Sequence, residues 1–68
     1  MSSMHERTLL TERDLAGMLG KPPRTLSQWR YRQVGPPFLR LVGGSVRYDL
    51  ADIEAWLDTQ RVDLGIEA

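Results

Sequence analysis

Glycine and proline residues divide this 68-residue chain into short segments, and that division limits its fold more than any other feature. The divisions fall at residues 20–23, 35–37 and 43–44, and each one separates two short apolar stretches. Proline cannot continue a helix, and it pushes the residue before it toward extended geometry. The sequence therefore predicts a small domain built from short helices and a tight hairpin.

The segment before the first division carries the signals of a helix N-terminus. Thr11 is a favourable N-cap, and Asp14 stands at the spacing of a capping box. Apolar residues then recur at helical spacing, and Gly20 suits the left-handed position that ends a helix. These signals predict a helix over residues 12–19.

A second helical pattern follows after the three-residue turn Gly20-Lys21-Pro22. Pro23 suits a first helical turn, and Leu26 and Trp29 form an apolar stripe. The prolines at 36 and 37 stop the pattern, so the helix is expected over residues 23–32. Two short helices joined this way have the dimensions of a helix-turn-helix, although many helical hairpins share them.

The remaining segments predict a hairpin and a third helix. Residues 38–42 and 46–48 are rich in strand-forming side chains, and Gly43-Gly44-Ser45 between them suits a tight turn. Asp49 can cap a helix that runs to about residue 60. The expected fold is mainly α with a small β-hairpin, in the order of a winged helix-turn-helix.

The whole chain is expected to form one domain between two tails. Residues 1–7 are read as a flexible N-terminal tail, residues 8–61 as the winged helix-turn-helix domain, and residues 62–68 as an acidic C-terminal tail. The domain is small, so its core should be thin. The predicted core consists of Leu9, Leu15, Leu19, Leu26, Trp29, Leu41, Ile53, Trp56 and Leu57.

Composition excludes several kinds of function. The chain has no cysteine and a single histidine, His5, so disulfides, thiolate metal sites and paired histidine ligands are excluded. No apolar stretch approaches the roughly 20 residues of a membrane span, and no signal peptide is visible. We expect a cytoplasmic binding module without a cofactor, a metal or a small-molecule ligand, because a chain this small has little room for an enzyme pocket.

The net charge of zero conceals a strongly uneven distribution. Residues 21–48 contain no acidic residue, whereas the segments on both sides are acidic overall. A basic block of this kind is typical of a surface that binds a polyanion, and the alternative is chance clustering on a solvated surface. The cations of this block are Lys21, Arg24, Arg30, Arg32, Arg40 and Arg47.

The expected second helix presents a polar face opposite its apolar stripe. Arg24 can donate twice to guanine, Gln28 can pair twice with adenine, and Ser27 can donate or accept. All three lie toward the N-terminal half of the helix, which is the half that usually enters the major groove. An ordinary solvated helix face is the alternative. The residues expected at phosphates around this face are Thr25, Arg30, Tyr31 and Arg32, with Lys21 in the preceding turn.

The expected hairpin carries one arginine on each strand, Arg40 and Arg47, beside a slim tip of Gly43, Gly44 and Ser45. A tip with little side-chain bulk can approach a DNA backbone or enter a minor groove, where arginine is favoured. The alternative is that the glycines serve only the turn and that the arginines are solvated.

Two further features have both a structural and a functional interpretation. Trp29 and Trp56 could stack on bases, but their apolar helical surroundings favour core packing. The acidic residues of the third helix either form a solvated face or a surface that meets a protein partner or a neighbouring copy. These residues are Asp52, Glu54 and Asp58.

The joint pattern resembles a known family over about residues 8–61. Small excisionases (recombination directionality factors) and AlpA-like regulators, which have a MerR-type winged helix-turn-helix, share this order of motifs. The matching motifs are Leu10-Thr11 leading to Leu19-Gly20, Pro23-Arg24-Thr25-Leu26, Trp29-Arg30, Gly35-Pro36-Pro37-Phe38, Arg40-Leu41, Val46-Arg47-Tyr48 and Asp52-Ile53-Glu54-Ala55-Trp56-Leu57.

The resemblance implies binding to double-stranded DNA near an attachment site, DNA bending, and help to a tyrosine integrase that excises a phage or integrative element. It implies a location in the host bacterial cytoplasm or nucleoid, and side-by-side binding of several copies is expected. A transcriptional regulator is the alternative role, and an adaptor that binds only protein is a further one. The sequence departs from the family at Pro22, where serine often caps the helix, and at Val42 and Ser45, which make the hairpin longer and its tip uncharged.

Overall fold

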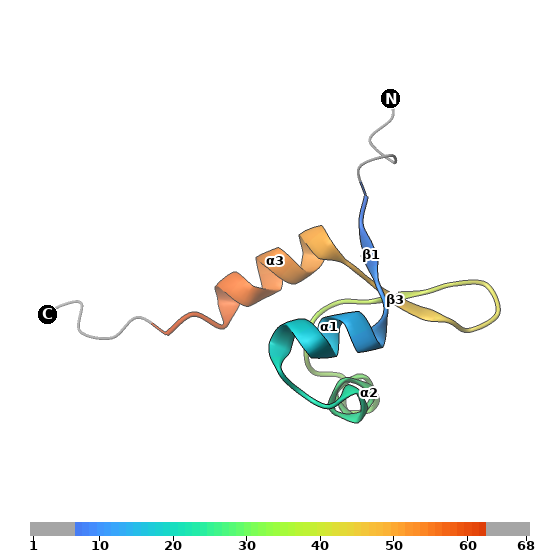
Figure 1. Cartoon of the computed structure of the whole chain (residues 1–68), viewed down its shortest axis with the longest axis horizontal. Helices are drawn as coiled ribbons and strands as arrows, with labels where there is room; N and C mark the ends of the chain where they lie inside the picture. Colours follow the sequence, from blue (N-terminus) through green and yellow to red (C-terminus); the bar gives the residue numbers. More distant parts are fainter. Residues whose placement is uncertain (1–6, 63–68) are drawn as a thin grey trace, which may run out of the picture.

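The computed structural model describes residues 7–62, in which three short helices surround a small sheet of three antiparallel strands (Figure 1). The strands lie in the order β1-β3-β2. The arrangement is a winged helix-turn-helix, as the sequence predicts. The elements are β1 (Leu9–Leu10), α1 (Glu12–Leu19), α2 (Pro23–Arg32), β2 (Leu39–Arg40), β3 (Val46–Asp49) and α3 (Leu50–Thr59).

Helix α1 has the bounds that its capping signals predict. The side chain of Thr11 accepts from the backbone N–H of Asp14 at 3.0 Å, and the Asp14 carboxylate accepts from the backbone N–H of Thr11 at 3.1 Å. The helix ends at Gly20, whose φ of 69° is left-handed. The capping box and the glycine therefore define this helix locally.

Helix α2 also has its predicted bounds, but its two ends are unusual. Pro22 at the N-cap provides no side-chain hydrogen bond, and Pro23 occupies the first helical position. At the other end Gln33, not a glycine, adopts the left-handed conformation with a φ of 60°. The chain then turns sharply through Gly35, which has a φ of 88°.

The sheet differs from the predicted hairpin in two ways. Strand β1 was not predicted, yet Leu9 pairs with Asp49 and Leu10 with Tyr48 of β3. A strand of two residues is too short to show an alternating pattern, so no periodicity could reveal it. Strand β2 is also shorter than the predicted 38–42, because the turn of the hairpin already begins after Arg40.

The core is smaller than the predicted one and partly different. Leu9, Leu41 and Leu57 were expected inside but are about two-fifths exposed. Leu41 lies beyond the paired part of β2. The two tryptophans are half-buried and pack on each other, with ring centroids 5.8 Å apart. The fully buried apolar residues are Leu15, Ala16, Leu26, Tyr48 and Ile53.

The third helix begins where β3 ends. Asp49 pairs in the sheet and also accepts a hydrogen bond from the backbone N–H of Ala51 at 3.1 Å, which confirms the predicted cap. Helix α3 then runs away from the hairpin formed by β2 and β3, which projects on the opposite side (Figure 1). Within residues 7–62 no helix has the length and hydropathy to cross a membrane. The expected tails lie almost wholly outside the described residues, at 1–6 and 63–68.

We predict that Gly35→Ala lowers the free energy of unfolding by about 1–3 kcal/mol. Its φ of 88° disfavours any side chain, and a Cβ there would lie 2.9 Å from Cε3 of Trp29. Urea unfolding followed by tryptophan fluorescence measures the change. Gly17→Ala is the matched control, because that position lies inside α1 with open space around it. The unfolding free energy of the control should rise by about 0.5–1 kcal/mol. Equal losses in both variants would contradict a specific requirement for glycine at position 35.

A second prediction concerns acid stability. Hydrogen bonds from the backbone N–H of Thr11, and then from its side chain, hold the pKa of Asp14 below its ordinary value of 3.8. The ionised carboxylate therefore stabilises the fold above pH 3.8, and this contribution is lost as the pH falls through the lower value of the folded state. Asp14→Asn should make the unfolding free energy less dependent on pH below about pH 4. Urea titrations at several acidic pH values measure the unfolding free energy of the parent protein and of Asp14→Asn. The prediction is refuted if this free energy depends on pH equally steeply in both proteins.

Candidate nucleic-acid interface

The outward face of α2 is polar and basic. Arg24, Gln28 and Tyr31 are exposed and lie on one side of the helix, since they are separated by four and three residues. Leu26 on the opposite side is fully buried. Arg32 is also exposed, and α2 contains no acidic residue. The structure therefore brings together most of the α2 residues that the sequence assigns to DNA.

The smaller polar residues of α2 are more enclosed. Thr25 and Ser27 are half-buried, and the Ser27 hydroxyl donates to the carbonyl oxygen of Arg24 at 3.0 Å. The hydroxyl oxygen of Ser27 keeps its capacity to accept. Lys21 in the turn between α1 and α2 is exposed. These three residues therefore lie at the edges of the exposed face of α2.

Arg30 points inward instead of joining this face. Its guanidinium lies 2.7 Å from the Glu12 carboxylate and donates to the Tyr48 hydroxyl at 2.8 Å. It also lies over the Phe38 ring, 5.7 Å from the ring centroid. We call Arg30, Glu12, Tyr48 and Phe38 the Arg30 cluster. One signal was available in the sequence, because Arg30 follows the buried Leu26 by four residues and so shares its side of the helix.

Arg30 keeps its charge under all ordinary conditions. Burial opposes the charged form of Arg30, but the hydrogen bonds that Arg30 donates to Tyr48 and Glu12 outweigh this effect and raise the pKa of Arg30 above its usual value. The side chain of Arg30 is 17% exposed and that of Glu12 is 29% exposed. The pair is thus partly shielded from water, and it joins α2 to α1 and β3.

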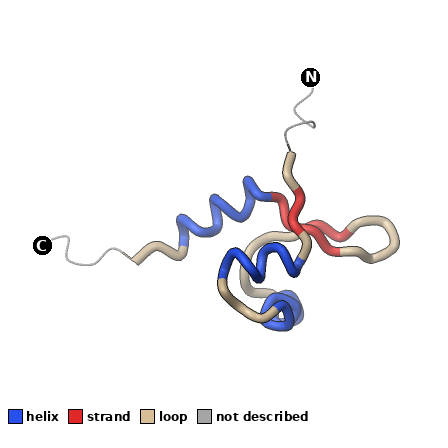
Figure 2. Tube along the Cα trace, in the orientation of Figure 1, coloured by secondary structure: helices blue, strands red, loops and turns tan. Residues whose placement is uncertain are grey.

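The hairpin of residues 39–49, which we call the wing, ends in an open tip (Figure 2). The backbone N–H of Leu41 donates to the carbonyl of Ser45 at 2.7 Å, and that of Gly44 donates back to Leu41 at 2.8 Å. Gly43 and Gly44 both have a positive φ, of 92° and 96°. Val42 at the tip is fully exposed, so the tip presents an apolar side chain and no charge.

The two arginines of the wing lie on opposite faces of the hairpin. In the sheet register Arg40 is paired with Val46, whereas Arg47 is paired with Leu39, and paired residues share a face. Arg47 is half-buried, and its guanidinium donates to the carbonyl of Val46 at 2.8 Å. Arg40 is exposed, and its guanidinium lies over the Phe38 ring at 5.6 Å from the centroid.

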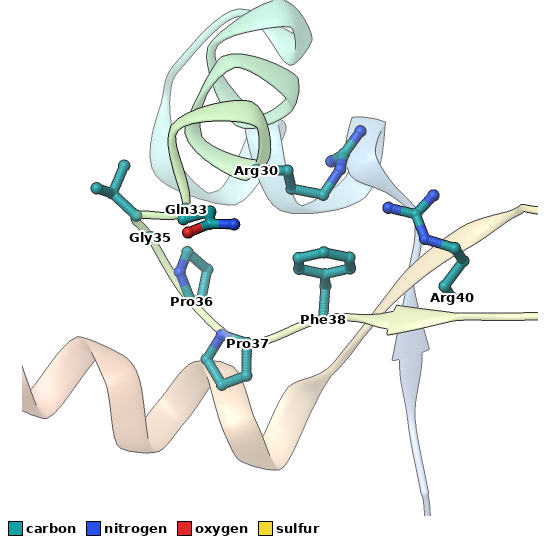
Figure 3. A pocket seen from close by; sticks show the side chains of 8 residues that line it. Arg30, Gln33, Gly35, Pro36, Pro37, Phe38 and Arg40 are labelled. Carbon is teal, nitrogen blue, oxygen red and sulfur yellow. The ribbon is translucent and has the colours of Figure 1, made fainter.

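A groove of about 710 Å³ lies between the end of α2 and the start of the wing (Figure 3). The Phe38 ring forms its floor, with Arg30 and Arg40 above the ring and the Gln33 amide at one side. The sequence interpretation did not include Gln33, because no glycine or asparagine marks the end of α2 there. The groove is lined by Arg30, Gln33, Val34, Gly35, Pro36, Pro37, Phe38 and Arg40.

Acidic residues gather on a different part of the molecule. Asp52, Glu54 and Asp58 are exposed on α3, and an apolar recess of about 290 Å³ lies between this helix and Pro37. Among residues 7–62, no group of three or more histidine, cysteine, aspartate or glutamate side chains is placed to hold a metal ion. The exposed cations of α2 and the wing are thus separate from the acidic residues of α3.

Comparisons with known proteins agree with this geometry. Residues 9–61 match the model of a protein family described as a helix-turn-helix domain. The matched segment begins at β1 and ends just beyond α3, so it includes the two helices, the wing and the last helix. Neither the comparison with curated proteins nor the comparison with solved structures gave a match.

We predict that Arg30→Ala lowers the free energy of unfolding by about 1.5–3 kcal/mol, because it leaves Glu12 and Tyr48 without their shared partner. Arg24→Ala is the matched control and should stay within about 0.5 kcal/mol of the parent protein. Urea unfolding of the two single variants measures both effects.

A double-mutant cycle separates the ion pair from the rest of the cluster. Arg30→Ala combined with Glu12→Ala should show a coupling of about 0.5–3 kcal/mol. Strictly additive losses would mean that the ion pair contributes nothing to stability.

Proposed function

We propose that this chain, which belongs to the helix-turn-helix domain family, binds specific double-stranded DNA with α2 in the major groove. The observation that carries the proposal is the exposed, acid-free face of α2 beside a projecting wing with an exposed arginine. Helix-turn-helix proteins place the second helix of the pair in the major groove. The wing would then face the adjacent minor groove or its backbone.

The exposed side chains divide between base edges and phosphates. Arg24 and Gln28 have the chemistry for two-point contacts with guanine and adenine. Ser27 is restricted to accepting, because its hydroxyl proton is already donated to Arg24. The residues with phosphate-binding chemistry around this face are Lys21, Thr25, Tyr31 and Arg32.

The proposed cellular role is that of an excisionase-like accessory factor. It would bind and bend DNA near an attachment site and promote excision of a phage or integrative element by a tyrosine integrase. Support comes from the family, which includes excisionase- and AlpA-like DNA-binding proteins. A small transcriptional regulator is the second candidate, since the same surface of α2 and the wing would bind operator DNA. An integrase gene and attachment site beside the coding gene favour excision, and their absence favours regulation.

A single copy has limited surface for DNA. One module of this size buries about 600–1,000 Å² of protein surface on a duplex. Tight binding is therefore expected where copies occupy adjacent sites or where a protein partner adds contacts. Helix α3 runs away from the wing, and its exposed acidic residues Asp52, Glu54 and Asp58 are available for such contacts.

The proposed role is tested by selecting bound fragments of the source genome at about 0.15 M salt, where surface charges are already well screened, followed by footprinting. Several adjacent protected sites beside an attachment region support the excisionase role. One isolated site over a promoter supports the regulator. If no fragment is recovered, with or without the integrase, DNA binding is refuted and the adaptor interpretation takes its place.

We predict that Arg24→Ala and Gln28→Ala each weaken binding to the selected site by about 1–3 kcal/mol, the contribution of a good two-point contact to discrimination between bases. Binding to unrelated DNA should change less, so the ratio of specific to non-specific affinity falls. Fluorescence anisotropy with both duplexes measures the two affinities.

Arg61→Ala is the control for this prediction, because that arginine lies beyond α3 and pairs with Asp58. It should leave both affinities unchanged. Circular dichroism must show that every variant is folded. A double variant of Arg24 and Gln28 that still prefers the selected site would exclude α2 as the reading element.

A further inference from the structure

The groove between α2 and the wing contains an arginine whose charge is not neutralised within the described part of the chain. Arg40 is exposed, and none of the ion pairs among residues 7–62 involves it. Arg30, which also lies over the Phe38 ring, is neutralised by Glu12 at 2.7 Å. The groove therefore has a net positive charge that comes from Arg40.

Gln33 stands in this groove at a position that favours glycine. Within residues 7–62 it is the one non-glycine residue with a positive φ. Glycine would adopt this helix-ending conformation without the penalty of a Cβ. Its side-chain amide faces the space above Phe38 (Figure 3). A strained residue with its polar group in a charged groove is typical of a site that binds a ligand.

The electrostatics of the helix end agree with an anion at this place. The C-terminal end of α2 carries a partial negative charge from its carbonyl groups, which alone would repel an anion. Arg32 in the last turn of α2 opposes this effect, whereas the charge of Arg30 is already balanced by Glu12. Arg40 then adds its charge from the other wall of the groove.

We propose that this groove binds one phosphodiester of the DNA backbone, with the Arg40 guanidinium and the Gln33 amide as its donors. The inference rests on the proposed function. If α2 occupies the major groove and the wing the adjacent minor groove, one backbone strand passes between them, where this groove lies. Phe38 holds the Arg40 guanidinium from below, and Arg30 keeps its own partners inside the protein.

The test uses the full chain and a series of duplexes of the selected site, each with one methylphosphonate, which removes the charge of a single phosphate. In the parent protein one position between the two contacted grooves should weaken binding roughly tenfold, the loss expected for a hydrogen-bonded charge. In Arg40→Ala this position should become silent, and in Gln33→Gly its effect should become smaller, while the other positions keep their effects. Arg40→Ala should also reduce the salt slope by about one unit.

Gln33→Gly separates binding from folding. It relieves the positive φ, so the variant should unfold at the same or a higher urea concentration and yet bind DNA more weakly. Arg61→Ala, far along the chain, should retain the whole methylphosphonate profile. If both groove variants show the full effect of the parent protein at this position, the groove holds no phosphate even though the chain binds DNA. If the parent protein binds no duplex at all, the proposed function itself fails.

Discussion

The contact on which the rest of the structure depends is the partly buried ion pair between Arg30 and Glu12, together with the Tyr48 hydroxyl. Within residues 7–62 five residues form the fully buried apolar core, so burial of apolar surface supplies limited stability. In such a thin core, a polar contact that joins α1, α2 and β3 has a large share in holding these elements together. Loss of either partner leaves a half-buried charge without compensation, which costs more than an intact pair contributes.

This contact also fixes the distance between the two surfaces proposed to meet DNA. Arg30 attaches α2 to β3, and the Phe38 ring beneath it leads directly into β2. The turn at Gly35 packs closely on Trp29, so the connection between α2 and the wing has little freedom. The exposed face of α2 and the wing are therefore held as one preformed surface, which lowers the entropic cost of binding.

Local signals in the sequence were sufficient for much of the fold, and long-range contacts account for what they missed. The bounds of α1 and α2 follow from the cap at Thr11 and from the glycine and proline residues, because these act within a few residues of themselves. Strand β1 exists only through its pairing with β3, and two residues show no period. The spacing of Arg30 from Leu26 places Arg30 on the inner side of α2, but its partners Glu12 and Tyr48 come from distant parts of the chain. Gln33 was missed because its conformation contradicts the preference of its residue type.

The structure also changes what the basic block implies for binding. Six phosphate contacts would give a log–log salt slope of about −5.4, whereas withdrawal of Arg30 into the protein leaves five and an expected slope of about −4.5. Arg47 hydrogen-bonds to its own strand, which makes it a weaker candidate for a phosphate. With fewer electrostatic contacts, non-specific affinity falls, and the share of the binding energy that depends on base sequence rises. Recognition of one DNA site would then depend on Arg24 and Gln28. The remaining affinity would come from further copies of this chain, or from a protein partner, bound at adjacent sites.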